Sequence, residues 1–292
     1  MNNLSVDDNK RIKALLSFII IIIFWLSAGI ALTLFFRSLI SSISLNAINS
    51  TYYKYIEANI SFFAMALGIY ISLKYIMKIP LIKLISTNNF INKRYLLISF
   101  SITIFYLIIY MIIGNISGYK EISFNNIKLS ERLIFLVIVL ILTPFQCALE
   151  ELLYRGVLLR ALVGNYYDNN KIISVISSII VGIAFTIPHL SNPELVSYMY
   201  FPLGYYFIFG FLTSFFTLHY KTVEIAIAVH VANNLFIALI CNYPNSALSS
   251  KSLYLEKTAV PHYIDYLVLT IIFITIGFVL NRKIKMTKEN IK

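Results

Sequence analysis

The feature that most constrains this chain is a succession of long apolar segments separated by short polar gaps. A helix needs about 20 apolar residues to cross a bilayer core of about 30 Å. Hydropathy predicts eight such spans, at residues 14–36, 60–77, 95–114, 133–153, 172–187, 199–218, 223–240 and 263–280. Of all residues 59% are hydrophobic and 13% charged, whereas soluble chains are about half apolar and a quarter charged. The sequence excludes a water-soluble protein and predicts an all-α, polytopic transmembrane helical bundle.

No internal repeat, long linker or low-complexity stretch divides the chain, so residues 1–292 are predicted to form a single membrane domain. The net charge of +11 is spread over the gaps and the C-terminus, which favours a lipid bilayer rather than nucleic acid as the partner. With the N-terminus in the cytoplasm, 16 of the 24 Lys and Arg residues lie inside and seven outside, and Lys74 lies at a boundary. The positive-inside rule therefore predicts a multi-pass protein of the cell membrane with both termini cytoplasmic.

Ionisable side chains inside apolar segments are few, since each costs roughly 2.5 kcal/mol or more at the centre of a membrane helix. Together with two amides they make up a short list of candidates: Glu150, Glu151, Arg155, His189, His230, Asn233 and Asn234. Each of them needs a partner or a function.

The adjacent carboxylates in the fourth span are predicted to differ. Glu151 and Arg155 are four residues apart and share a helical face, so the arginine can neutralise Glu151. Glu150 has no such local partner, which makes it the candidate for a general base. The alternative is an ion-pair pin, with both glutamates solvated at a helix end.

Two further spans carry histidines. Phe185 and His189 share a face, and Pro188 removes a helical hydrogen bond beside them. His230 lies near the middle of an apolar run, with Asn234 one turn further on. The structural alternatives are a helix end for His189 and inter-helix hydrogen bonding for His230 and Asn234.

The depths of these residues in the membrane support a single site. At about 1.5 Å per residue, Glu150, His189 and His230 lie roughly 20, 27 and 13 Å from the cytoplasmic ends of their helices. These heights agree if the hairpin of the fourth and fifth helices protrudes about 10 Å into the cytoplasm. The sequence therefore predicts one site in the cytoplasmic half of the membrane.

Three motifs, in order, resemble those of the CAAX-protease and bacteriocin-processing (CPBP, or Abi) family of intramembrane proteases. EExxxR stands at residues 150–155, FxxxH at 185–189 and HxxxN at 230–234. The resemblance covers about residues 130–240, which we take as the predicted catalytic core. It implies that Glu150, assisted by His189, activates a water molecule, while His230 and Asn234 stabilise the oxyanion. The supporting residues would be Glu151, Arg155 and Phe185.

A metal is the main mechanistic alternative. The family is often described as metalloproteases, and Glu150, His189 and His230 are ligand types that zinc accepts. The chain lacks the H-E-x-x-H pattern that places two histidines and a base on one helix. No cofactor is therefore expected, with zinc as the alternative.

The resemblance leaves the substrate open, because family members trim prenylated CAAX proteins in eukaryotes and serve peptide maturation, bacteriocin self-immunity or pheromone processing in bacteria. A bias towards Ile, Asn and Lys is typical of a low-GC bacterium, where prenylated proteins are not expected. A membrane-associated peptide or protein is the predicted substrate. The alternatives are a non-proteolytic immunity factor or scaffold with the same fold and, less favoured because no repeat is found, a proton-coupled transporter.

Overall fold

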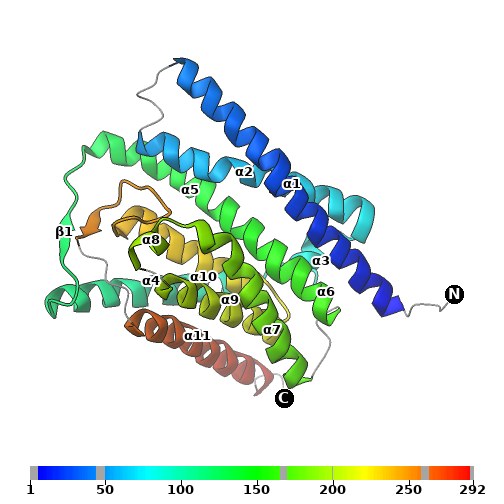
Figure 1. Cartoon of the computed structure of the whole chain (residues 1–292). Helices are drawn as coiled ribbons and strands as arrows, with labels where there is room; N and C mark the ends of the chain where they lie inside the picture. The colour runs from blue at the N-terminus through cyan, green and yellow to red at the C-terminus, as the bar shows by residue number, and fades with distance from the viewer. Residues whose placement is uncertain (1–5, 44–49, 165–169, 199, 258–262, 290–292) are drawn as a thin grey trace.

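The computed structural model describes residues 6–43, 50–164, 170–198, 200–257 and 263–289. It is a bundle of helices, and both termini lie at the end of the bundle away from a small sheet (Figure 1). The main helices are α1 (Val6–Ile43), α2 (Thr51–Ile71), α4 (Lys93–Ile116), α5 (Leu129–Glu151), α7 (Lys171–Thr186), α9 (Phe201–Tyr220), α10 (Glu224–Leu235) and α11 (Tyr263–Glu289). Short helices connect them: α3 (Leu81–Ile85), α6 (Leu159–Val163) and α8 (Glu194–Tyr198).

Seven helices in the described part of the chain are long and apolar enough to cross a membrane. The seventh predicted span, residues 223–240, corresponds to the apolar helix Glu224–Ile240, which is shorter and mostly enclosed by its neighbours. The polytopic helical bundle is thus confirmed, with seven full-length spans instead of eight among the described residues. The division into a single domain stays a prediction.

Polarity in the bundle is arranged as a membrane requires. Leu34, Phe35, Ile141 and Ile274 are exposed on the outer surface, where they can face lipid. The buried polar groups, in contrast, include Glu150, Glu151, Arg155, Glu194, Glu224 and His230. Because unpaired charges are costly in a membrane, these buried polar groups are candidates for a functional site.

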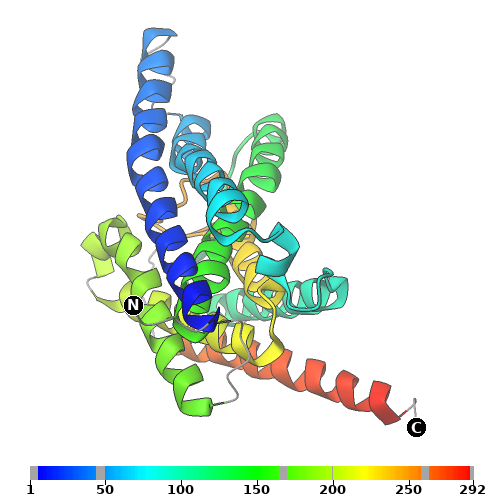
Figure 2. The same cartoon turned by 90° about the vertical axis from the view of Figure 1, so that its right-hand side faces the viewer.

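Helix ends differ most from the hydropathy prediction. The predicted loop at residues 37–59 is largely helical, since α1 runs to Ile43 and α2 begins at Thr51. Ser50 caps α2 by accepting a hydrogen bond from the Tyr53 amide. The C-terminal end of α1 projects beyond the neighbouring helices in both views (Figures 1 and 2). Hydropathy detects only the apolar part of a helix. Helical turns made of polar residues at its ends are therefore not predicted. Two parts of the prediction lie outside the described residues: the start of the sixth span, residue 199, and residues 165–169 of the gap between the fourth and fifth spans.

A three-stranded sheet closes the end of the bundle opposite the termini. Its strands are β1 (Ile122–Phe124), β2 (Cys241–Asn242) and β3 (Tyr254–Glu256), in the order β1-β3-β2. β1 pairs antiparallel and β2 parallel with β3. The predicted loops at 115–132 and 242–262 therefore contain strands, which are too short to show an alternating pattern in sequence.

Helices α7 and α9 approach closely at a pair of glycines. A Cβ atom placed on Gly210 would lie 2.9 Å from the Gly182 Cα atom, closer than real contacts allow. Small residues at such crossings let membrane helices pack tightly. The crossing matters for function because α7 and α9 both border the site described below.

Replacing Gly210 with alanine is therefore expected to lower the free energy of unfolding by about 1–3 kcal/mol, the usual cost of overpacking. The measurement is unfolding of the purified protein in detergent micelles. Gly277→Ala is the matched control, because its added Cβ would find its nearest neighbour at 3.5 Å, an ordinary contact. Equal stability of the two variants would contradict the tight crossing.

Candidate active site

Helix α5 positions three of the predicted residues at its end. It continues through the π-helical turn Leu152–Leu158 into α6. Such π turns are frequent at functional sites. Arg155 lies in this turn, fully buried, with its Nη1 atom 3.1 Å from Glu151 Oε2. The predicted Glu151–Arg155 pair is confirmed.

Arg155 also joins α5 to its neighbours. It donates to the Thr213 hydroxyl at 2.6 Å and to the Gly210 carbonyl at 3.3 Å, both on α9. Its guanidinium lies 4.4 Å from the ring centre of Phe185 on α7. A cation over an aromatic face is attracted to it, most strongly when desolvated. Phe185, predicted as a supporting residue, thus contacts Arg155 directly.

His230, on α10, lies between the two carboxylates. Its Nδ1 atom is 2.8 Å from Glu151 Oε1, and its Nε2 atom is 3.6 Å from Glu150 Oε2. The first distance is a hydrogen bond, whereas the second is too long for one. The sequence predicted only Arg155 as a partner of Glu151. The contact between Glu151 and His230, which links α5 to α10, is found only in the structure.

Glu150 is buried and faces α10. Its Oε1 atom accepts a hydrogen bond from Gln146 Nε2 at 3.2 Å, and its Oε2 atom has no hydrogen-bond partner. The prediction that Glu150 lacks a local partner is therefore wrong for one oxygen. Gln146 lies one turn earlier on the same face, and the list of ionisable residues with Asn233 and Asn234 did not include it. The other oxygen, Oε2, has no hydrogen-bond partner among the described residues.

His189 lies in the 3₁₀ turn Ile187–Ser191, which follows α7 and begins beside Pro188. Its Nδ1 atom is 2.9 Å from the Phe185 carbonyl oxygen, and its ring stacks on Tyr206 with centroids 3.9 Å apart. Among the described contacts no hydrogen bond joins His189 to Glu150. The position of His189 is therefore set by its own helix and by α9.

Asn234 lies one turn beyond His230. Its amide nitrogen donates to Cys147 Sγ at 3.4 Å, and its side-chain oxygen accepts from Asn233 at 3.1 Å. Tyr205 in turn donates to Asn233. A thiol sulfur is a weak acceptor, so the Asn234 amide can exchange it for a stronger one.

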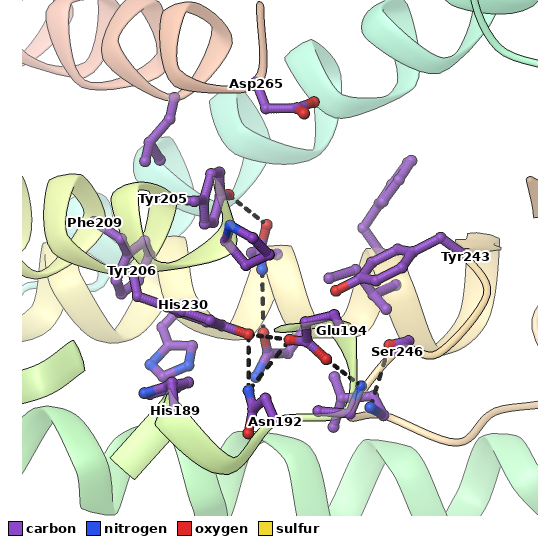
Figure 3. Close-up of a pocket in the computed structure, with 18 of the residues that line it drawn as sticks. His189, Asn192, Glu194, Tyr205, Tyr206, Phe209, His230, Tyr243, Ser246 and Asp265 are labelled. Atoms are coloured by element: carbon purple, nitrogen blue, oxygen red, sulfur yellow. Dashed lines mark hydrogen bonds between the residues drawn. The ribbon is translucent and has the colours of Figure 1, made fainter. Parts of the chain in front are cut away.

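A second polar cluster, which the sequence did not reveal, lies beside His189. Figure 3 shows Glu194 amid hydrogen bonds from the Tyr206 hydroxyl and the Asn192 amide. Its other oxygen accepts from the Ala247 backbone at 2.9 Å. Glu194 thus ties α9 and the loop after β2 to α8. No sequence signal distinguished Tyr206 from the other 20 tyrosines.

All four predicted catalytic residues, Glu150, His189, His230 and Asn234, line one cavity of about 470 Å³. The predicted convergence is thereby confirmed. The cavity also reaches Lys120, Ile122 and Glu256 at the sheet, so it extends away from the termini. Tyr243 borders this end, where burial, reinforced by the Glu194 carboxylate, raises the pKa of its phenol and keeps it a hydrogen-bond donor.

The side chains do not fit a metal centre well. Both ring nitrogens of His230 face carboxylates, and Nδ1 of His189 is engaged by a backbone carbonyl. No group of three or more His, Cys, Asp or Glu side chains in the described ranges is arranged to hold a metal ion. We therefore derive no catalytic step through a metal, and the metal-free site stays a prediction.

The fold and the site define a polytopic membrane protein with a buried cluster of titratable residues facing a cavity among its spanning helices. Residues 130–236 match the family model described as Rce1-like, type II CAAX prenyl endopeptidase. The segment with the three motifs thus matches an Rce1-like domain of the CPBP family, which confirms the resemblance.

The chain is also similar to a curated protein, the Uncharacterized protein YyaK of Bacillus subtilis (strain 168). The two are 28% identical over 179 residues, which cover 61% of this chain and 58% of that relative. The match thus spans less than two thirds of either protein. No solved structure matches the chain significantly.

Proposed function

We propose that this protein is an intramembrane endopeptidase of the CAAX-protease type that hydrolyses a peptide bond in a membrane-associated peptide or protein. The observation that carries the proposal is the buried Oε2 atom of Glu150, a residue that lines the cavity. This atom has no hydrogen-bond partner among the described residues and lies 3.6 Å from His230 Nε2. The Rce1-like match over residues 130–236 supports the same reaction at the level of the family.

In the proposed mechanism Glu150 removes a proton from the attacking water molecule and passes it to the amine nitrogen when the C–N bond breaks. A positioned carboxylate can act as a general base when it lies within hydrogen-bond reach of that proton. His189 lines the same cavity and assists on the α7 side. The Gln146 amide holds one oxygen of Glu150, and the other oxygen lies 3.6 Å from His230 Nε2.

His230 and Asn234 would stabilise the oxyanion that forms when water attacks the peptide carbonyl. A doubly protonated His230 ring would donate from Nδ1 to Glu151 and offer a second donor at Nε2. Asn234 offers its amide in place of the weak bond to Cys147. Both donors come from α10, one turn apart.

Glu151 and Arg155 would act through the residues they hold. Glu151 orients the imidazole of His230 through its contact with Nδ1, and Arg155 holds Glu151 through an ion pair. We assign them a positioning role, in agreement with the supporting role implied by the resemblance.

We further propose that the protein lies in the cell membrane with both termini in the cytoplasm, on the strength of the Lys and Arg asymmetry. Arg155 is buried among helices and is therefore not a loop charge that sets orientation. The excess of Lys and Arg on the cytoplasmic side remains when Arg155 is left out of the count. In this orientation the sheet end of the cavity faces outward, although Glu150 itself is nearer the cytoplasmic end of its helix. A membrane-associated peptide or leader remains the proposed substrate class.

The proposal is tested with the purified full chain in lipid vesicles. Wild-type protein is incubated with a pool of synthetic apolar peptides, and new peptide termini are identified by mass spectrometry. We expect cleavage within apolar segments of a subset of peptides. Absence of any new terminus with folded protein would favour the non-proteolytic immunity or scaffold function.

A further inference from the structure

Two side-chain amides that line the cavity with Glu150 carry oxygen atoms without a hydrogen-bond partner among the described residues. Asn59, on α2, is 3% exposed, and its Nδ2 atom donates to the Tyr55 carbonyl at 2.8 Å. Because a carbonyl only accepts, the nitrogen must face Tyr55, which leaves Oδ1 on the other side of the amide. That oxygen has no hydrogen-bond partner.

Gln146 shows the same arrangement on α5. Its Nε2 atom donates to the Glu150 carboxylate, which fixes the orientation of the amide. Its Oε1 atom is buried and also has no hydrogen-bond partner. Buried polar atoms are nearly always satisfied in folded proteins, so two such acceptors beside one cavity require an explanation.

The two amides lie on packed helices. Helix α2 contacts α5 through the Tyr55–Thr143 hydrogen bond of 2.5 Å and the Phe63–Phe145 ring contact of 5.0 Å. Asn59 lies between Tyr55 and Phe63 on α2, and Gln146 directly follows Phe145 on α5. Both side chains line the cavity that contains Glu150.

We infer that Asn59 and Gln146 form a binding site for the backbone of an extended, apolar peptide segment next to the bond that is cut. Both free atoms are acceptors, so their ligand must supply donors, and an extended peptide presents backbone N–H groups. The adjacent wall is apolar, since Trp25 and Phe62 pack with ring centres 5.6 Å apart and both line the cavity. This wall suits aliphatic or aromatic side chains. The inference rests on the proposed peptidase function and deepens it.

The test measures binding separately from cleavage. Purified Glu150→Gln protein in detergent micelles is incubated with a pool of random-sequence apolar decapeptides, and retained peptides are identified by mass spectrometry. Adding Asn59→Leu or Gln146→Leu to this protein is expected to lower retention at least tenfold. Met111→Leu, which alters an apolar residue lining the same cavity, is the matched control and should retain the peptides.

Two further measurements separate substrate binding from a structural role. Asn59→Leu is expected to leave the thermal unfolding midpoint unchanged or raised, because it removes a buried unsatisfied acceptor. Retained peptides resynthesised with single N-methylated amides should lose binding about tenfold at one or two positions. A lowered midpoint with unchanged retention, or full binding by every N-methylated analogue, would overturn the inference.

The outcomes also distinguish this site from the peptidase function. If peptides are retained through Asn59 and Gln146 but wild-type protein cleaves none of them, the peptidase proposal fails and the binding site stands. If wild-type protein cleaves peptides and the Asn59→Leu variant binds and cleaves them equally well, the binding site fails and the peptidase stands. Retention of no peptide by any variant counts against the site.

Discussion

Glu150→Gln protein is expected to cleave peptides about 10²–10⁴-fold more slowly than the wild type, the usual contribution of a general base. Glutamine has nearly the same shape as glutamate but cannot take a proton from water at neutral pH. Its side chain still reaches Gln146 and the cavity, so peptide binding should change little. The measurement is the initial rate at saturating peptide, with kcat and KM determined separately.

The matched control is Glu131→Gln, on the first turn of the same helix. Glu131 pairs with Lys251 at the sheet end of the bundle, 40% exposed, and does not line the cavity. This variant should retain wild-type kcat. Glu150→Gln protein that is folded and as active as the wild type would show that another group activates the water.

A comparison of neighbours sharpens the assignment. Glu151→Gln removes the charge that Arg155 and His230 both contact, so its main effect should be on stability. If Glu150→Gln were to lower the amount of folded protein while Glu151→Gln left both abundance and activity intact, the two carboxylates would have been assigned the wrong way round.

The sequence reveals the residues of the site better than their partners. Each ionisable group in an apolar helix is conspicuous because it is costly there, and motif spacing identified Glu150, His189, His230 and Asn234 without a structure. Spacing within one helix also predicted the Glu151–Arg155 pair. It carries no information on contacts between helices, which explains why the bond from His230 to Glu151 was missed.

Neutral partners were missed for a different reason. Gln146 stands one turn before Glu150, a spacing visible in sequence, but amides were considered only next to His230. Asn59 was placed in a loop, because hydropathy began the second span after it whereas the helix begins at Thr51. Glu194 lies outside the apolar runs, and only the folded chain brings it to Tyr206.

Loss of Arg155 is expected to produce the largest change in stability. Arg155→Met removes a fully buried cation and leaves Glu151 with its carboxylate buried and only His230 beside it. Breaking a buried ion pair by removing one partner typically costs about 3–5 kcal/mol, because the remaining charge is uncompensated. The contacts to Thr213 and Gly210 on α9 are lost as well. Unfolding in detergent micelles measures the difference.

The control is Arg37→Met, which removes the exposed ion pair with Glu57 at 3.9 Å and should change stability by less than about 1 kcal/mol. A double variant separates charge from packing. Adding Glu151→Gln to Arg155→Met removes the stranded carboxylate, so part of the lost stability should return even though a second site residue has changed. A double variant less stable than Arg155→Met would contradict this account. It would mean that Glu151 is stabilised mainly by His230 and that Arg155 is stabilised mainly by its contacts with α9.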